Sequence, residues 1–181
     1  VATIRGPDGS SGFGRSLALR GTDLVVGAPN TTVGDLSDAG RAYLYDFLSP
    51  DDPVHVFEAA EPVMRERIGW AVGLGNDFVA VSAPGGDGAF EIGMTDGRIL
   101  VFDLDSGNLQ IELALEVPDD SDYFGASIAV YAASVAVGAP YEDGETGAVY
   151  LFTVPEPGAL LASLTGLATL ALRARSRSRP S

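Results

Sequence analysis

The chain contains the same short unit three times, and this repetition constrains the fold more than any other feature of the sequence. Each copy opens with an apolar residue followed by glycine, continues through an apolar run, and closes with a small residue followed by Ala-Pro. The openings are Phe13-Gly14, Ile68-Gly69 and Phe124-Gly125, and the closings are Gly27-Ala28-Pro29, Ser82-Ala83-Pro84 and Gly138-Ala139-Pro140. Glycine and proline are 15 residues apart in every copy, and the copies recur after 55 and 56 residues. Spacing this regular predicts one supersecondary unit built three times.

Each unit predicts four short β-strands. Two apolar runs of the motif are followed by a polar loop and then by an aromatic-rich run at residues 40–46, 97–103 and 147–153. A fourth apolar run follows in the first two copies, at residues 54–57 and 109–115. The runs are short and rich in β-branched and aromatic residues, which favours strands over helices. Four strands in a repeat of this length are typical of a β-propeller blade, so we expect an all-β fold with copies near 12–58, 67–115 and 123–153.

The motif resembles the FG-GAP repeat of integrin α-subunit propellers and of many bacterial surface proteins. The resemblance extends over residues 1–153, and the second copy departs from it with Ile68 and Ser82. Phe13, Ile68 and Phe124 are expected to fill the gaps between adjacent blades, while the three prolines end strands because proline cannot donate to a sheet. Residues 1–5 occupy the place of a fourth strand before the first copy. Three blades imply part of a larger ring or an open assembly.

Residues 154–181 form a second segment of different character. Pro155-Glu156-Pro157 precedes an uncharged run at 158–172, and an arginine cluster that includes Arg173 and Arg175 follows. This order resembles the PEP-CTERM sorting signal of exported bacterial proteins. The resemblance implies an exosortase-type enzyme as partner, a transient anchor in the inner membrane, and final attachment to the cell surface or its matrix.

The physical properties of the tail agree with an anchor. A helix of 15 residues is about 22 Å long, slightly short of the ~30 Å apolar core of a bilayer. The arginines after it place the C-terminus in the cytoplasm and the repeats outside. The alternative is an amphipathic or buried terminal helix, although the run has no polar face.

Composition narrows the function classes. The chain holds 25 acidic and 11 basic residues, for a net charge of −14, and all basic residues are arginine. Such a surface repels nucleic acid, so no nucleic-acid partner is expected. Cysteine is absent, which excludes disulfides and thiolate chemistry. The single histidine, His55, lies in a strand-like run and is expected to be structural. The many acidic residues leave a glycosidase with paired carboxylates as an alternative, but we expect no catalytic residues and no enzyme activity.

Calcium is the one cofactor that the sequence suggests. Integrin propellers bind it between the two halves of the motif, but here residues 20–23, 75–77 and 131–134 offer too few carboxylates for six to eight oxygen ligands. The acidic loops after Ala-Pro remain, and the best candidate is the loop that carries Glu142, Asp143 and Glu145. The alternative is that these acids simply form solvated turns.

Two classes of function stay open at this point. The first is an exported binding or adhesion module whose loops contact an extracellular polysaccharide or a protein. The second is a structural component of a matrix or coat, or the non-catalytic propeller of a larger exported enzyme.

Overall fold

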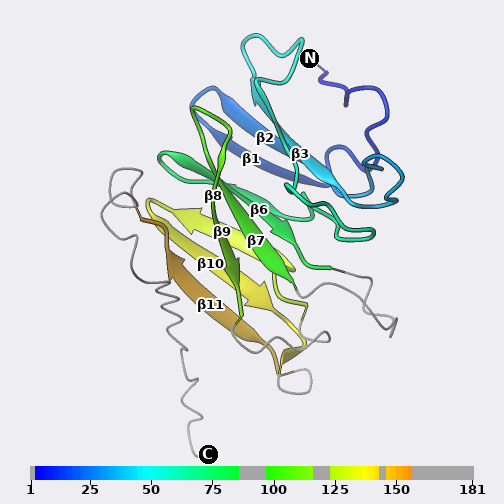
Figure 1. The fold of residues 1–181 in the computed structure, drawn as a ribbon. Helices are drawn as coiled ribbons and strands as arrows, with labels where there is room; N and C mark the ends of the chain where they lie inside the picture. The colour runs from blue at the N-terminus through cyan, green and yellow to red at the C-terminus, as the bar shows by residue number, and fades with distance from the viewer. Residues whose placement is uncertain (1–2, 86–96, 116–122, 143–145, 156–181) are drawn as a thin grey trace, which may run out of the picture.

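The computed structural model describes residues 3–85, 97–115, 123–142 and 146–155. In this part of the chain the regular elements are eleven strands, which form three antiparallel sheets (Figure 1). The first sheet has the order β1-β2-β3-β4, with β1 Ser16–Arg20, β2 Asp23–Ala28, β3 Arg41–Asp46 and β4 His55–Phe57. The second has the order β5-β6-β7-β8, with β5 Val72–Leu74, β6 Phe78–Ala83, β7 Arg98–Asp103 and β8 Leu109–Ala114. The third has the order β11-β10-β9, with β9 Ser127–Tyr131, β10 Ser134–Ala139 and β11 Ala148–Thr153.

The strands confirm the all-β prediction, with four strands in each of the first two copies and three in the third. Each motif forms the first two strands of its sheet, and each aromatic-rich run forms the third. One prediction at the N-terminus is wrong: residues 3–5 are not a strand. Ile4 instead packs its side chain against the first sheet, because the sheet offers an apolar face there and the segment makes no ladder of hydrogen bonds with a partner strand.

Alternating side chains give every sheet two apolar faces. We call "front" the face of the first sheet that carries Val26, Tyr43 and Tyr45, and "back" the face that carries Leu44 and Phe57. The same names apply to the equivalent positions of the other two sheets. Strands with two apolar faces need cover on both sides, so the sheets must stack.

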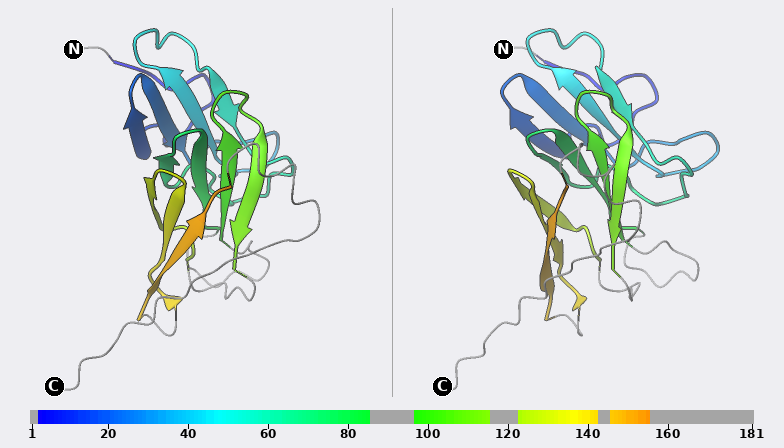
Figure 2. Two further views of the ribbon diagram at one scale, coloured as in Figure 1. Left: turned by 90° about the vertical axis from the view of Figure 1, so that its left-hand side faces the viewer. Right: turned by 60° about the vertical axis from the view of Figure 1, so that its left-hand side comes forward.

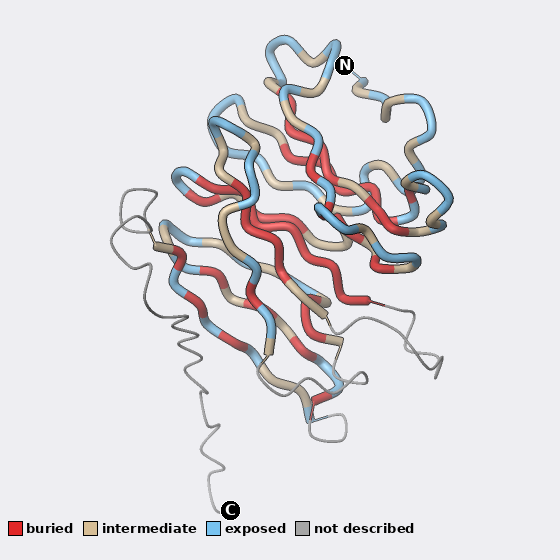
Figure 3. The backbone as a smooth tube through the Cα atoms, in the orientation of Figure 1, coloured by how far each residue is buried: buried red, intermediate tan, exposed pale blue. Residues whose placement is uncertain are grey.

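The sheets stack back to front along the chain, as the two turned views in Figure 2 show. Buried side chains from the back of the first sheet and the front of the second form one core cluster, which joins Leu44 and Phe57 to Val81 and Leu100. A second cluster joins the back of the second sheet to the front of the third. In Figure 3 the buried backbone accordingly runs through the middle of the stack. The three repeats therefore share two inter-sheet cores.

The apolar residue that opens the motif fills the predicted gap in the second and third copies, but not in the first, where the described residues place no neighbouring sheet against Phe13. Ile68 is fully buried in the first inter-sheet core, and Phe124 is buried in the second. Phe124 meets the rings of Tyr150 and Phe152 at centroid distances of 5.6 and 6.0 Å. Phe13 lies on the front of the first sheet and is half-buried.

A glycine of the motif allows the backbones of neighbouring sheets to touch. Gly69 has φ +90°, and a Cβ placed on it would lie 2.3 Å from the carbonyl oxygen of Arg41 in the first sheet. Gly27 opposite is equally confined, because its Cβ would lie 2.0 Å from the carbonyl oxygen of Gly69. Ser16 Oγ donates a hydrogen bond of 2.8 Å to the same oxygen. Gly27 and Gly69 of the motif therefore allow the first and second sheets to contact each other through their backbones.

Polar contacts also join the second sheet to the segment between β4 and β5 and to the first sheet. Glu66, fully buried, accepts hydrogen bonds from Arg98 of β7, which also pairs with Glu112 at 2.9 Å. Burial alone would lower the pKa of Arg98, but the hydrogen bonds and charge of Glu66 outweigh it and the pKa is raised. His55 Nε2 donates to the carbonyl oxygen of Asp105 at 2.9 Å, which supports a structural role for this histidine.

The predicted C-terminal helix at 158–172 lies outside the described residues. Within those residues, the structure contains no helix long and apolar enough to cross a membrane.

Candidate ligand-binding surface

An aromatic row crosses one end of the stack, where β1, β5 and β9 begin and β2, β6 and β10 end. Trp70 meets Tyr123 edge to face at a centroid distance of 6.0 Å, and Tyr123 meets Tyr141 at 6.1 Å. Trp70 precedes β5, Tyr123 precedes Phe124, and Tyr141 follows the last proline of the motif. Trp70 and Tyr123 are half-buried, whereas half of Tyr141 is exposed. We call these three residues the aromatic row.

Two arginines lie against the tryptophan of the row. The guanidinium carbon of Arg15 is 4.2 Å from the centre of the Trp70 ring, and that of Arg67 is 5.5 Å from it. Contacts of this kind orient the guanidinium and are worth about 0.5–1 kcal/mol at exposed sites. Arg15 is itself exposed. The row thus combines flat apolar rings with positive charge, on a chain whose net charge is −14.

Two residues of this surface adopt a backbone conformation that favours glycine. Arg67 has φ 62° and Tyr123 has φ 56°, and Gly12 stands at the equivalent position of the first copy with φ 71°. The repeat therefore requires this conformation, and a residue with a side chain adopts it at a cost of about 1–2 kcal/mol. In the second and third copies the side chains so placed contact Trp70.

The predicted calcium loop is only partly within the described residues. Glu142 is buried, and its carboxylate accepts a hydrogen bond from the hydroxyl of Tyr150. Its backbone carbonyl oxygen accepts from Gly147 N at 3.0 Å and from Thr146 Oγ1 at 3.1 Å. Asp143 and Glu145 lie outside the described residues, so calcium binding there stays a prediction. Among the residues that are described, no three acidic or histidine side chains gather as a metal site would require.

The loops that bind calcium in integrin propellers are short hairpin turns here. Arg20 pairs with Asp23, and Ser134 pairs with Tyr131, each across two residues. Arg20 also donates hydrogen bonds to Asn76 of the next sheet. A guanidinium and a tight turn do not suit a calcium ion, which prefers six to eight oxygen ligands.

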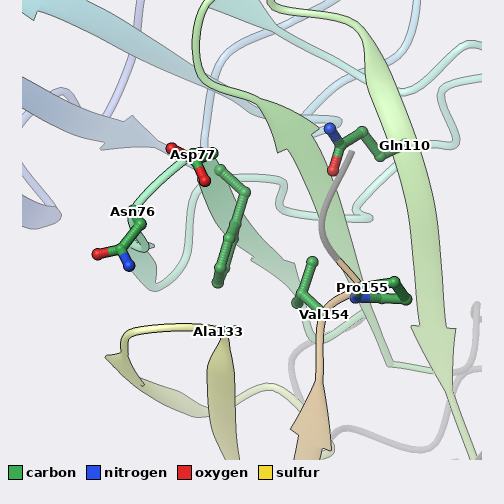
Figure 4. Close-up of a pocket in the computed structure, with 7 residues that line it drawn as sticks. Asn76, Asp77, Gln110, Ala133, Val154 and Pro155 are labelled. Carbon is green, nitrogen blue, oxygen red and sulfur yellow. The ribbon is translucent and has the colours of Figure 1, made fainter. Parts of the chain in front are cut away.

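A small pocket lies between the second and third sheets, at the end opposite the aromatic row (Figure 4). Its lining residues are Asn76, Asp77, Phe78, Gln110, Ala133, Val154 and Pro155. The cavity volume is about 20 Å³, which holds one water molecule and no organic ligand. Pro155 is the one residue of the predicted sorting motif in the described part of the chain. Glu156, Pro157, Arg173 and Arg175 lie outside it.

Comparison with known proteins addresses the repeats directly. Residues 1–45 and 113–152 match the family model described as FG-GAP repeat. These two segments are FG-GAP repeats. The second copy lies between them, and it is the copy with Ile68 and Ser82 in place of the usual motif residues.

Two further searches bear on the fold. The structure is similar to the crystal structure of the computationally designed Ika4 protein, with a TM-score of 0.52 and 15% identity over 84% of this chain and 71% of that one. At this identity the similarity concerns the fold alone. A search of the curated proteins found no match.

The residues of the aromatic row are not part of the repeated motif, but one of its positions indicates a surface role when the three copies are aligned. Arg15, Trp70 and Ala126 occupy the same position after the motif glycine. A position that accepts residues so different in size and charge does not lie in a shared core. The single tryptophan of the chain at such a position indicates a surface role.

Proposed function

We propose that the three sheets are blades of a β-propeller, and that the protein is a non-catalytic, surface-associated module that binds an extracellular polysaccharide. The support for the architecture is the FG-GAP match together with the back-to-front stacking of the sheets. FG-GAP repeats are typical of extracellular and surface proteins. The end of the stack that carries the aromatic row is the proposed binding end.

The aromatic row is the observation that carries this proposal. Aromatic rings offer flat apolar faces of the size of a sugar ring, and tyrosine adds a hydroxyl for hydrogen bonds. The three rings are packed edge to face, with planes at 89° and 62° to one another, and Tyr141 is the most exposed of them, so it offers the surface that a sugar ring would contact first. Arg15 adds a guanidinium, which pairs well with a carboxylate. An acidic polysaccharide built from uronic acids offers both features. Because the net charge of −14 repels a polyanion elsewhere on the chain, its binding would be confined to the surface around Arg15 and Arg67.

The proposal extends to how the protein reaches the surface. The segment 154–181 would anchor the exported chain in the inner membrane until an exosortase-type enzyme acts on it near Pro155-Glu156-Pro157. Release or transfer would then leave the repeats at the cell surface or in its matrix, where polysaccharide is abundant.

Affinity electrophoresis tests the binding directly. The full chain is run through gels that contain a polyuronate, a neutral glucan or no polymer, and retardation is measured against polymer concentration. We expect retardation by polyuronate, with weaker binding after Tyr141→Ala. Phe47→Ala is the matched control, because Phe47 is an exposed aromatic residue outside the row. Arg15→Gln is expected to weaken polyuronate binding more than glucan binding.

Two results would overturn the proposal. If no polymer retards the protein, then a structural role in a matrix or coat explains the chain better. If Phe47→Ala weakens binding as much as Tyr141→Ala, then the row is not the binding surface.

A further inference from the structure

Among the described residues, exposed apolar side chains remain on both outer faces of the stack. On the front of the first sheet, Leu17 is 62% exposed and Leu19 is 64% exposed. On the back of the third sheet, Val149 is 57% exposed and Leu151 is 49% exposed. In Figure 3, β11 alternates between buried and exposed residues, and β1 alternates between intermediate and exposed ones, because one side of each strand is packed more closely than the other.

The same positions are packed wherever two sheets of the chain meet. Val72 and Leu74 of β5 correspond to the two open leucines of β1, and both pack in the first inter-sheet core. Ile99 and Val101 of β7 correspond to the two open residues of β11, and both are fully buried in the second core. The open faces are therefore the two halves of an interface that the chain already makes twice internally.

The open parts of the two faces, along β1 on the front of the first sheet and across the back of the third sheet, carry no charged side chain. The front of the first sheet is open along β1, at Leu17 and Leu19, whereas Ile4 and Phe13 already pack against its centre. The back of the third sheet presents Ala129, Ala136, Val149 and Leu151. In a chain with 20% charged residues, two uncharged faces of several adjacent positions are unlike ordinary surface. They suit a partner with the same kind of apolar sheet face.

We propose that a second copy of this chain covers these faces, with the back of its third sheet against the front of the first sheet of its partner. The contact is head to tail, because the two surfaces that meet are different. Each copy carries one of each surface, so two copies can satisfy both contacts at once in a closed pair. The stacking inside the chain then continues across the two copies without a change of interface.

The test uses the oligomeric state of the full chain and two single variants. Leu17→Arg alters only the front face, and Leu151→Arg alters only the back face. Leu48→Arg is the matched control, because Leu48 is 71% exposed in the turn after β3, away from both faces. Molar mass is measured by light scattering after size exclusion over a range of concentrations, and circular dichroism verifies that each variant is folded.

We expect the unaltered chain and Leu48→Arg to form dimers. Each face variant alone should dissociate at least about tenfold more readily, as expected for central apolar residues of an interface. A mixture of Leu17→Arg and Leu151→Arg should form a one-to-one heterodimer, because the intact back of the first variant meets the intact front of the second.

Three results would overturn the proposal. The unaltered chain could be a monomer at concentrations of about 100 μM, far above a Kd of about 1 μM that corresponds to −8.2 kcal/mol. Dimers could persist in both face variants, which would place the contact elsewhere on the chain. The mixture could fail to associate, which would contradict a head-to-tail contact.

Discussion

Substitution of alanine for the three motif glycines separates backbone conformation from contact between sheets. Gly14, Gly69 and Gly125 have nearly the same backbone angle, with φ of 88°, 90° and 93°. Their surroundings differ. A Cβ at Gly14 would meet nothing within 4 Å, and one at Gly125 would come within 3.3 Å of the Ser82 side chain. A Cβ at Gly69 would lie 2.3 Å from a backbone oxygen of the first sheet and 2.9 Å from a backbone nitrogen.

The structure therefore predicts a graded loss of stability. Gly14→Ala should cost about 1–2 kcal/mol, because only the positive φ opposes the side chain. Gly125→Ala should cost about the same or slightly more, since the neighbouring side chain can move by a few tenths of an ångström. Gly69→Ala meets backbone that cannot move without separating two sheets, so overpacking adds about 1–3 kcal/mol to the cost of the angle.

Urea unfolding followed by circular dichroism measures the three costs. The midpoint should fall least for Gly14→Ala and most for Gly69→Ala, with similar slopes for all variants. If Gly69→Ala costs no more than Gly14→Ala, then the glycine does not serve the contact between the first and second sheets, and the stacking described above is wrong at this point.

Three further predictions follow from other parts of the chain. Hydrogen bonds from Ser106 lower the pKa of Asp103, so this carboxylate stabilises the fold above its ordinary pKa of 3.8, and the stabilisation is lost as the pH falls below that value. Ser106→Ala should therefore move acid unfolding to higher pH, with a change in the free energy of unfolding of less than about 1 kcal/mol because solvent screens the group. An unchanged acid transition would contradict this prediction. Calcium binding at the acidic loop should saturate in one step near 10⁻⁴–10⁻³ M and should raise the melting temperature. The double variant Asp143→Asn, Glu145→Gln should abolish both effects. A response that survives in this variant would mean that calcium is attracted diffusely to the acidic surface. Deletion of residues 158–181 should release the exported protein from membranes into the soluble fraction, and equal fractionation with and without the segment would contradict the anchor.

The strands and the gap-filling residues Ile68 and Phe124 could be predicted because the same pattern of residues occurs in three copies. Alignment of the copies separates what the unit requires from what varies within it. The glycine, the Ala-Pro pair and the opening apolar residue are shared, and Ile68 and Phe124 lie between the sheets as predicted. An error appears where repetition gives no help, at residues 3–5.

The aromatic row could not be predicted because it depends on contacts between copies. Trp70 belongs to the second copy, while Tyr123 and Tyr141 belong to the third, and no local pattern connects them. Their proximity follows from the stacking of the sheets and from the left-handed backbone at Arg67 and Tyr123. The sequence does not indicate this backbone conformation in the second and third copies, because only the first copy has a glycine, Gly12, at the equivalent position.

Binding of polysaccharide at the aromatic row can be measured directly by fluorescence, because Trp70 is the single tryptophan of the chain. Trp70 emission is recorded while a polyuronate is added to the full chain, with a neutral glucan as comparison. We expect a saturable change in Trp70 emission at the same polyuronate concentrations that retard the protein in affinity gels, and loss of both effects with Tyr141→Ala. Binding that retards the protein in gels but leaves Trp70 emission unchanged would place the ligand elsewhere and contradict the account.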